Sequence, residues 1–424
     1  MSERKRIYLC LAHMSEAGLE QKYIKEAFDT NWVVPLGPNV NGFEKDLEDF
    51  VNENQNEKLA KRVVALSSGT AAVHLALINC GVKAGDEVCV QSFTFCASSH
   101  PITYLGATPI FIDSENDTWN MDPELLEEAI KDRIAKTGKK PKAIVPVALY
   151  GMPYQIDKIM AIANKYDIPV VEDAAEGFGS RWKGQVLGTF GKYGVLSFNG
   201  NKMITTSGGG ALVTANEEEW REIMMYATQY RESYPYYQHE KIGFNYRMSN
   251  ICAGIGRGQM TVLNDHIAHH KHVQKMYEEL LANVPGIHVH AQPKTGEYDS
   301  NYWLCTITID ENVKIKGQEN AYKTIVTGAV GGAAGVIHAA SSAVTDCQPN
   351  DNVEALRVFM DAAGIEARPV WKPMHKQPVY QGCPAYVNGV SEAIFKVGMC
   401  LPAGPYVSDE DVKYIVDSIK SAIL

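Results

Sequence analysis

The sequence lacks any cysteine pair spaced for a metal site or a redox motif. Its nine cysteines are scattered over 424 residues, are odd in number and never form a C-x-x-C motif. This usage is typical of a reducing compartment, in which cysteines serve as small core residues. We therefore expect no zinc site and no other metal site.

The sequence also lacks a cluster of basic residues and a long apolar run near its start. The formal net charge is −10, and no block of lysine and arginine reverses it locally. This charge argues against a nucleic-acid or anionic-membrane surface. The first apolar run, Ile7–Ala12, is too short for a secretory signal, so we expect a cytoplasmic protein.

Charged residues are missing from one stretch, Thr324–Thr345, which is rich in Ala, Gly, Val and Ser. The stretch is long enough for a membrane span but only weakly hydrophobic, and it contains four glycines, at 328, 331, 332 and 335. We interpret it as a buried or flap-like insertion, and we expect no membrane partner.

Apolar strands alternate with helical patterns in the first half of the chain. This alternation predicts an α/β fold with a parallel sheet that is buried on both faces and binds ligands at the carboxyl ends of its strands. The predicted strands are Arg62–Leu66, Glu87–Val90, Pro109–Ile112, Ala143–Leu149 and Ile168–Val171. The predicted helices are Thr70–Cys80, Cys96–Leu105, Glu124–Lys136 and Ile156–Lys165.

The pattern changes after about residue 260 to a smaller α+β arrangement. Because the chain is too long for one small core, we expect a large domain over residues 1–262 and a smaller one over residues 263–424. The second part is predicted to contain the helix Leu263–Leu281, strands near Ile287–His290 and Tyr302–Ile309, and the helices Asn352–Ala363 and Asp409–Ile423. Histidines 266, 269, 270 and 272 have no ligand partner at helical spacing, so we interpret them as a solvated polar face.

One lysine, Lys202, lies among small residues between the apolar runs Tyr193–Phe198 and Ala211–Val213. A lysine in such a context can be desolvated, and its amine then reacts with a carbonyl, as in Schiff-base lysines. A plain surface lysine is the alternative.

Three further elements fit a site for a phosphorylated aldehyde. Ser67–Thr70, between a strand and a helix, forms an anion cradle of amides and hydroxyls, or simply a helix cap. Asp173 ends an apolar strand, where a carboxylate keeps a pyridine nitrogen protonated, or caps a helix. Phe95 follows another strand, where an aromatic ring stacks on a flat cofactor or packs in the core.

With these elements in order, the chain resembles the DegT/DnrJ/EryC1/StrS family of sugar aminotransferases, which are pyridoxal-phosphate enzymes of fold type I. The resemblance runs from about Arg6 to the C-terminus. It is carried by the segments Trp32–Pro38, Ser67–Thr70, Glu172–Glu176, Ser197–Gly210, Gly243–Ser249, Gly364–Pro369, Trp371–His375 and Leu401-Pro402. It implies a large domain with a mostly parallel sheet, a smaller C-terminal α+β domain, and a homodimer with shared active sites.

The resemblance also implies a role for individual residues. Lys202 and Asp173 are the catalytic residues, the first as a Schiff base with pyridoxal 5'-phosphate and the second at its pyridine nitrogen. The residues expected to contact the cofactor are Ser68, Gly69, Thr70, Phe95, Asp173, Glu176, Ser197, Asn199, Lys202 and, from the neighbouring subunit, Asn245. The candidates for binding the substrate are Trp32, Arg247, Arg368, Trp371 and His375. For Arg368 and Trp371, packing between the domains is the alternative.

Two departures from the family pattern bear on the substrate. Many members carry glutamine or histidine in place of Glu176, and Gly-Glu-Gly-Gly in place of Ser207–Gly210. Both variants resemble the subgroup that aminates C4 of a UDP-4-keto-6-deoxy-N-acetylhexosamine, with L-glutamate as donor and 2-oxoglutarate as product. The alternatives are a dTDP-3-keto sugar, a cyclitol, or a regulatory protein without turnover. A pyridoxamine-dependent dehydratase is disfavoured, because those relatives have histidine at the lysine position.

Overall fold

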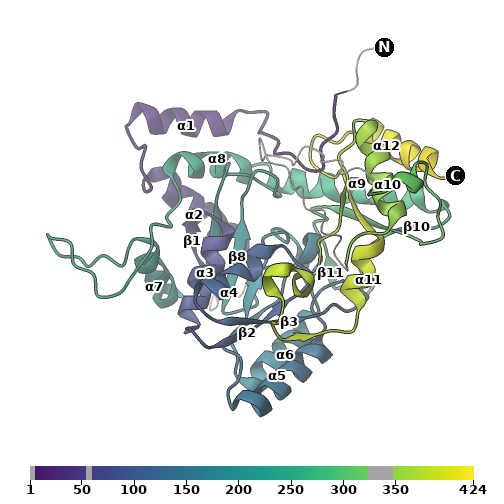
Figure 1. Ribbon diagram of the computed structural model, residues 1–424. Coiled ribbons are helices and arrows are strands. Elements are labelled where there is room, and N and C mark those ends of the chain that lie inside the picture. The colour runs from purple at the N-terminus through teal and green to yellow at the C-terminus, as the bar shows by residue number, and fades with distance from the viewer. Residues whose placement is uncertain (1–4, 54–59, 323–346) are drawn as a thin grey trace.

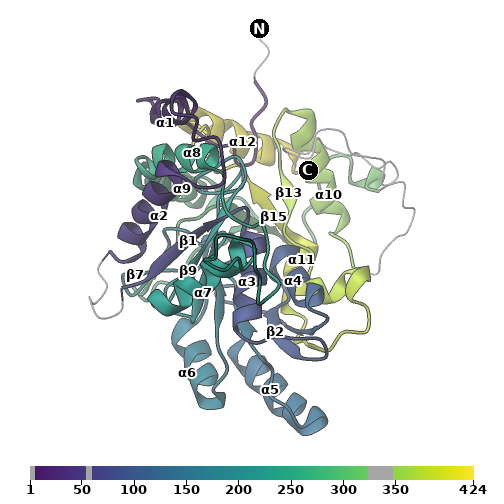
Figure 2. The same ribbon diagram turned by 90° about the vertical axis from the view of Figure 1, so that its left-hand side faces the viewer.

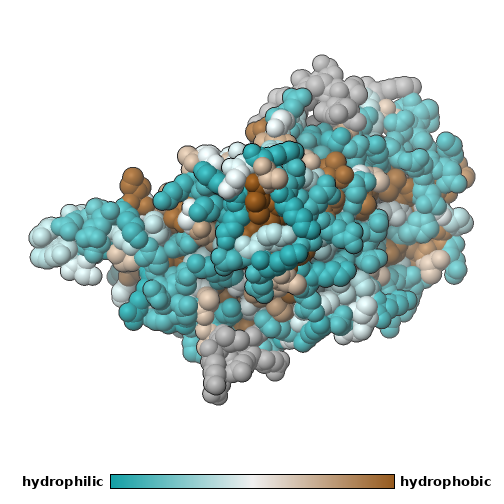
Figure 3. Space-filling model, turned by 90° about the horizontal axis from the view of Figure 1, so that it is seen from below, coloured by the Kyte–Doolittle hydropathy of each residue, from teal (hydrophilic) through white to brown (hydrophobic). Residues whose placement is uncertain are grey.

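The computed structural model describes residues 5–53, 60–322 and 347–424 (Figure 1). The stretch Thr324–Thr345, which we interpret as an insertion, lies outside the described residues. Among the described residues, no helix is long and apolar enough to cross a membrane. Seen from below, the surface is mostly hydrophilic, with small hydrophobic spots between polar side chains (Figure 3).

Two four-stranded sheets lie edge to edge and form the centre of the molecule. Their strand orders are β14-β3-β2-β4 and β5-β8-β9-β1, and two bridges, Ile144 with Val170 and Val147 with Asp173, connect β4 to the start and end of β5. All neighbouring strands run parallel except β9, which is antiparallel to both β1 and β8. The strands are β1 Arg62–Leu66, β2 Glu87–Gln91, β3 Thr108–Ile112, β4 Ile144–Val145, β5 Val171–Asp173, β8 Tyr193–Ser197, β9 Gly210–Thr214 and β14 Ala385–Tyr386.

Helices cover both faces of this sheet. Successive side chains of a strand point to opposite faces, and because these side chains are apolar, both faces have to be buried. In β2, Val88 and Val90 join the core under α3, whereas Cys89 joins the core under α5 and α6. The helices of this part are α1 Leu19–Asp29, α2 Pro38–Val51, α3 Gly69–Asn79, α4 His100–Tyr104, α5 Pro123–Thr137, α6 Ile156–Tyr166, α7 Glu217–Ala227 and α8 Asn250–Met260. The prediction of an α/β fold with a buried, mostly parallel sheet is confirmed.

The free edge of β1 is covered by side chains of α2. Glu44 Oε1 accepts the backbone N–H of Ala65 at 2.8 Å, and Glu48 Oε1 accepts that of Val63 at 3.0 Å. Unpaired N–H groups on an edge strand are a template for pairing with another chain. Two carboxylates of a helix therefore occupy the place that a further strand would take.

A second, separate core lies under an antiparallel sheet of order β10-β12-β15-β13. Its elements are α9 Leu263–Leu281, β10 Ile287–Val289, β12 Cys305–Ile309, α10 Asp351–Ala362, β13 Arg368–Pro369, β15 Gly398–Leu401 and α12 Asp409–Ala422. The helix α11 Val390–Val397 buries Ile394 and Phe395 in the first core instead. In both views, α10 and α12 lie at the opposite end of the molecule from α5 and α6 (Figure 1, Figure 2). Ile7 belongs to this core too, while β14 belongs to the central sheet, so a boundary at residue 262 stays a prediction.

Small elements connect the two parts. The hairpin β6 Arg181–Trp182 and β7 Gln185–Val186 pairs with β11 Tyr298–Asp299.

The predicted strand Ala143–Leu149 is shorter than expected, because only β4 pairs as a strand and the chain then turns at Leu149–Gly151. Tyr150 adopts φ 53° in this turn, a left-handed conformation that is rare for a tyrosine.

The prediction that the histidines of α9 form a solvated face is wrong for two of them. His266 and His270 are buried, because α9 crosses the segments that contain Met203 and Tyr302, and the Nδ1 atoms lie 3.2 and 3.1 Å from the carbonyl oxygens of these residues. Burial lowers the pKa of His270 to about 3. Among the described residues, no group of three histidine, cysteine or acidic side chains is arranged to hold a metal ion.

Candidate active site

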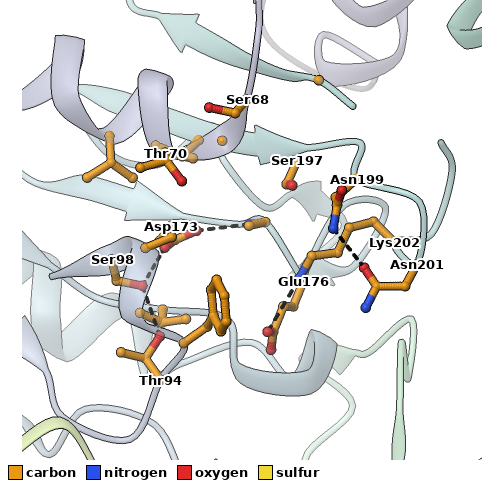
Figure 4. A pocket seen from close by; sticks show the side chains of 18 of the residues that line it. Ser68, Thr70, Thr94, Ser98, Asp173, Glu176, Ser197, Asn199, Asn201 and Lys202 are labelled. Atoms are coloured by element: carbon orange, nitrogen blue, oxygen red, sulfur yellow. Dashed lines mark hydrogen bonds and ion pairs between the residues drawn. The ribbon is translucent and has the colours of Figure 1, made fainter. Parts of the chain in front are cut away.

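A cavity of about 380 Å³ opens at the carboxyl ends of the central strands (Figure 4). It is lined by the end of β1, the start of α3, the segment after β2, the end of β5 and the loop between β8 and β9. The predicted residues that line it are Ser68, Gly69, Thr70, Phe95, Asp173, Glu176, Ser197, Asn199, Lys202 and Trp371. Segments far apart in the sequence thus bring most of the predicted cofactor residues together.

One end of the cavity is the N-terminus of α3. Ser68 caps this helix, and its Oγ accepts the backbone N–H of Ala71 at 3.0 Å. A Cβ atom at Gly69 would lie 3.1 Å from Cβ of Ser197, so glycine lets the helix start lie close to the end of β8. The amides at a helix start and the hydroxyls of Ser68, Thr70 and Ser197 are donors suited to a phosphate.

A buried carboxylate, that of Asp173, faces the middle of the cavity. Its Oδ2 accepts the hydroxyl of Ser98 at 2.6 Å, its Oδ1 accepts the N–H of Ala175 at 3.1 Å, and Ser98 in turn contacts Thr94 Oγ1 at 2.9 Å. Burial raises the pKa of Asp173, and the bond from Ser98 opposes this shift. The sequence reasoning missed Ser98 and Thr94, although two hydroxyls four residues apart after a predicted strand are a usable signal.

The amine of Lys202 lies at the other side of the cavity. Lys202 belongs to the loop between β8 and β9, and the ends of this loop are joined because Ser197 pairs with Gly210. Its Nζ lies 3.5 Å from Oε1 of Glu176 and 3.9 Å from the ring centroid of Trp303. The side chain is only 13% exposed, so the alternative of a plain surface lysine is wrong.

Aromatic rings form a wall of the cavity. Phe95 is 47% exposed and lines the cavity, so its alternative as a core residue is wrong. Its ring centroid lies 5.3 Å from that of Trp371. Trp303, which was not predicted, donates its indole N–H to the carbonyl of Asn201 at 2.7 Å and lies under the lysine amine.

Two arginines predicted to bind substrate do not line this cavity. Arg247 is 9% exposed and donates to Oε1 of Glu44 at 2.5 Å and to the carbonyl of Ala65 at 3.0 Å. Arg368 pairs with Glu366 at 2.5 Å. Both guanidinium groups therefore have carboxylate partners within this chain, and their role in substrate binding stays a prediction.

Three other predicted residues also lie outside the cavity lining. Trp32 is 40% exposed on the loop between α1 and α2, and Asn245 is exposed on the segment between α7 and α8. His375 Nδ1 lies 2.6 Å from Oγ of Ser92, and burial lowers the pKa of this histidine. An outward position is what a contact to a neighbouring subunit needs, and the roles of all three stay predictions.

The arrangement suits a flat, phosphorylated aldehyde. Donors for an anion, a buried carboxylate for a protonated ring nitrogen, an aromatic ring for stacking and an amine for a carbonyl carbon all face one cavity.

Comparison with known proteins points the same way. A family model described as the DegT/DnrJ/EryC1/StrS aminotransferase family matches residues 15–323 and 318–420. Along 417 residues the chain is 40% identical to EpsN of Bacillus subtilis (strain 168), which carries the name of a pyridoxal phosphate-dependent aminotransferase; the match covers 97% of this chain and 95% of EpsN. It is 32% identical to a GDP-perosamine synthase of Escherichia coli O157:H7, over 97% of this chain and 98% of that protein.

The fold has counterparts among solved structures. The crystal structure of a DegT DnrJ EryC1 StrS aminotransferase from Brucella abortus superposes with a TM-score of 0.79 at 25% identity. The superposition covers 96% of this chain and 95% of that one. The sequence and the fold are therefore similar to those of one group of proteins.

Proposed function

We propose that this chain, which belongs to the DegT/DnrJ/EryC1/StrS aminotransferase family, uses pyridoxal 5'-phosphate to transfer an amino group to a nucleotide-linked keto sugar. One observation carries the proposal: the amine of Lys202, the buried carboxylate of Asp173 and the start of α3 face a single cavity. Each of these groups matches one functional part of the cofactor.

The residues of the cavity fit that cofactor. Ser68, Gly69, Thr70 and Ser197 would hold its phosphate, and Asp173 would pair with its ring nitrogen. Phe95 would stack on the ring, and Glu176 and Asn199 would contact it from the side of the lysine. When bound, pyridoxal phosphate supplies an electron sink for the carbon that loses a proton.

Residues of this chain would carry the proton transfers. Nζ of Lys202 would accept the proton from Cα of the amino donor as general base, and as general acid it would then deliver this proton to the former aldehyde carbon of the cofactor. Asp173 holds a proton on the ring nitrogen, since Ser98 and Ala175 fix its carboxylate. The aromatic wall of Phe95 and Trp371 excludes water from one side of the cavity.

The first candidate acceptor is a UDP-2-acetamido-4-keto-2,6-dideoxyhexose, with L-glutamate as donor. Glu176 and the Ser207–Gly210 segment support it, because both depart from the common family pattern in the direction of that subgroup. The amino donor would leave as 2-oxoglutarate. The working form would be a homodimer in the cytoplasm, with Asn245 reaching the site of the neighbouring subunit.

A second candidate is a GDP-linked keto sugar. The observation that favours it is the 32% identity, along 97% of this chain, to an enzyme named for GDP-perosamine. The two candidates differ in the nucleotide that carries the sugar. They share one cofactor chemistry.

A panel of acceptors tests the proposal. Full-length protein loaded with pyridoxal phosphate is incubated with L-glutamate and UDP-, GDP- and dTDP-linked keto sugars, and 2-oxoglutarate and the amino sugar are measured. We expect turnover with a UDP-linked 4-keto sugar, and a loss of at least about 10³-fold in Lys202→Ala. The surface variant Lys22→Ala is the control. Turnover of only the GDP sugar would select the second candidate, and turnover of only a dTDP-3-keto sugar would refute both.

A further inference from the structure

The two carboxylate oxygens of Glu176 have different partners. Oε1 lies 3.5 Å from Nζ of Lys202, and Oε2 accepts the backbone N–H of Tyr150 at 2.7 Å (Figure 4 shows the contact with the lysine). The residue is 4% exposed. A rotation of this carboxylate would break one contact or the other, so its orientation is fixed.

Tyr150, which anchors Glu176, is itself held on several sides. Its hydroxyl accepts the backbone N–H of Trp371 at 2.8 Å, and its ring is inclined by only 18° to that of Trp303 and 15° to that of Trp371. Its backbone is left-handed, with φ 53° and ψ 20°. Such a conformation is rare for a tyrosine and persists where the surroundings determine it.

The amine of Lys202 is confined from two directions. Glu176 lies on one side, and the face of the Trp303 ring lies 3.9 Å away on another. The indole N–H of Trp303 is bonded to the carbonyl of Asn201, next to the lysine, so this ring does not turn freely. The titratable groups around Glu176 are Lys202 on its loop, Asp173 of β5, Tyr150 of the turn after β4 and Cys400 of β15.

We propose that Glu176 is a positioning residue for the amine of Lys202, held in place by the backbone of Tyr150, and that its charge sets the pH range in which this amine reacts. This inference rests on the proposed function, and it goes beyond a contact between Glu176 and the cofactor. A glutamine at this position would keep an acceptor for Tyr150 but would remove the charge beside the amine. Burial raises the pKa of Glu176, and Lys202 opposes that shift.

The variant Glu176→Gln tests the proposal by a measurement other than turnover. Full-length protein freed of cofactor is mixed with pyridoxal phosphate, and the appearance of visible absorbance is followed from pH 6 to 10. Only the neutral amine attacks the aldehyde, and a neighbouring carboxylate favours the ammonium form. We therefore expect the midpoint of the rate profile to move to lower pH in Glu176→Gln, with cofactor loading about tenfold faster than in the wild type at the acidic end of the range.

A matched control has the same chemical change elsewhere. Glu279 of α9 is exposed and its carboxylate pairs only loosely with Lys275, at 3.7 Å, so Glu279→Gln should leave the midpoint unchanged. If Glu176→Gln does not fold, Glu176→Asp replaces it. The shorter side chain of this variant moves the carboxylate away from the amine of Lys202 by about one methylene group. The midpoint of its loading rate against pH should therefore move in the same direction as in Glu176→Gln, by a smaller amount.

The outcomes separate the two proposals. A midpoint for the folded Glu176 variant that equals the wild-type value would overturn the positioning role, because the carboxylate would then be protonated or too distant to matter. Wild-type protein that shows no visible absorbance with pyridoxal phosphate at any pH would instead overturn the proposed function. A midpoint that moves in Glu279→Gln by as much as in Glu176→Gln would also reject the positioning role.

Discussion

The hydroxyl of Ser98 is one of the groups that favour the charged form of Asp173. Ser98 donates to this carboxylate at 2.6 Å, and the carboxylate is only 4% exposed. Burial raises the pKa of Asp173 and the hydrogen bond lowers it, so the two effects oppose each other at one atom. In the proposed function, the ionised carboxylate of Asp173 keeps the ring nitrogen of the cofactor protonated. Ser98 would therefore extend the pH range in which the enzyme is active towards acidic pH.

The variant Ser98→Ala should narrow that range. Without the bond, the pKa of Asp173 rises further, and because the carboxylate loses its charge as the pH falls through its pKa, activity is lost at a higher pH. We expect the acidic limb of kcat/KM against pH to move to higher pH. Ser99→Ala removes a hydroxyl that donates to the carbonyl of Cys96 and accepts from the hydroxyl of Tyr380, and it should not move this limb.

At the scale of elements, α3 has two roles at its first turn. Ser68 caps the helix through the N–H of Ala71, and the same residue lines the cavity where we place the phosphate. The helix cap that the sequence offered as an alternative to an anion site is therefore present beside it. We therefore expect the side chain of Ser68 to contribute both to the free energy of unfolding and to cofactor affinity.

The variant Ser68→Ala should weaken both properties. Loss of the cap lowers the free energy of unfolding by about 1 kcal/mol, and loss of a hydroxyl from the phosphate cradle raises the Kd for pyridoxal phosphate by about five- to tenfold. Asn216→Ala removes the corresponding cap of α7, where Asn216 accepts the N–H of Glu219 at 2.9 Å. Denaturant unfolding should show a similar loss there, with an unchanged Kd; an equal change of Kd would contradict a direct role for Ser68.

Local chemistry explains which elements the sequence predicted well. Asp122 caps α5 through two N–H groups with Pro123 at the first position, and the helix lies where this signal places it. The helix Leu263–Leu281 was also predicted with its observed bounds. The burial of His266 and His270 in this helix was not predicted. The segments that cover them contain Met203 and Tyr302, which lie far from these histidines in the sequence.

Part of the active site was predictable from the sequence in the same way, namely the residues at strand ends. Asp173 and Lys202 lie at ends of predicted strands or in the loop between them, so the rule for parallel sheets places them on one edge. Contacts that join distant segments carry no periodic signal. The bond from Ser98 to Asp173, the ring of Trp303 under Lys202 and the turn at Tyr150 became visible only in the folded chain.

At the scale of the whole molecule, one segment extends away from the body. It lies between α7 and α8 (Figure 1), and it exposes Tyr236 at 60% and Tyr237 at 79%. Asn245, which we expect to serve a neighbouring subunit, lies near the base of this segment, where it pairs with Thr228. A homodimer with shared sites would give this segment a partner.

Mixing two inactive variants tests the shared site. Lys202→Ala and Asn245→Ala should each be nearly inactive alone, whereas a heterodimer of the two restores one complete site. After joint refolding of equal amounts, we expect about a quarter of the wild-type activity. Activity that stays at the level of the parents would show that each site is built from one chain. Different affinity tags on the two variants, and purification on both tags in succession, would confirm that the mixed dimers had formed.

The two glutamates of α2 at the edge of β1 have a consequence for the newly made chain. Strand β1 pairs with β9, whose residues are synthesised roughly 150 positions later, which takes about 10–30 s at typical rates of translation. During that time the apolar strand has no strand partner. Glu44 and Glu48 precede it by about twenty residues or fewer, so α2 is available at once to occupy its other edge. We therefore expect β1 of the nascent chain to have one edge of unpaired backbone groups, which can pair with another chain, and not two.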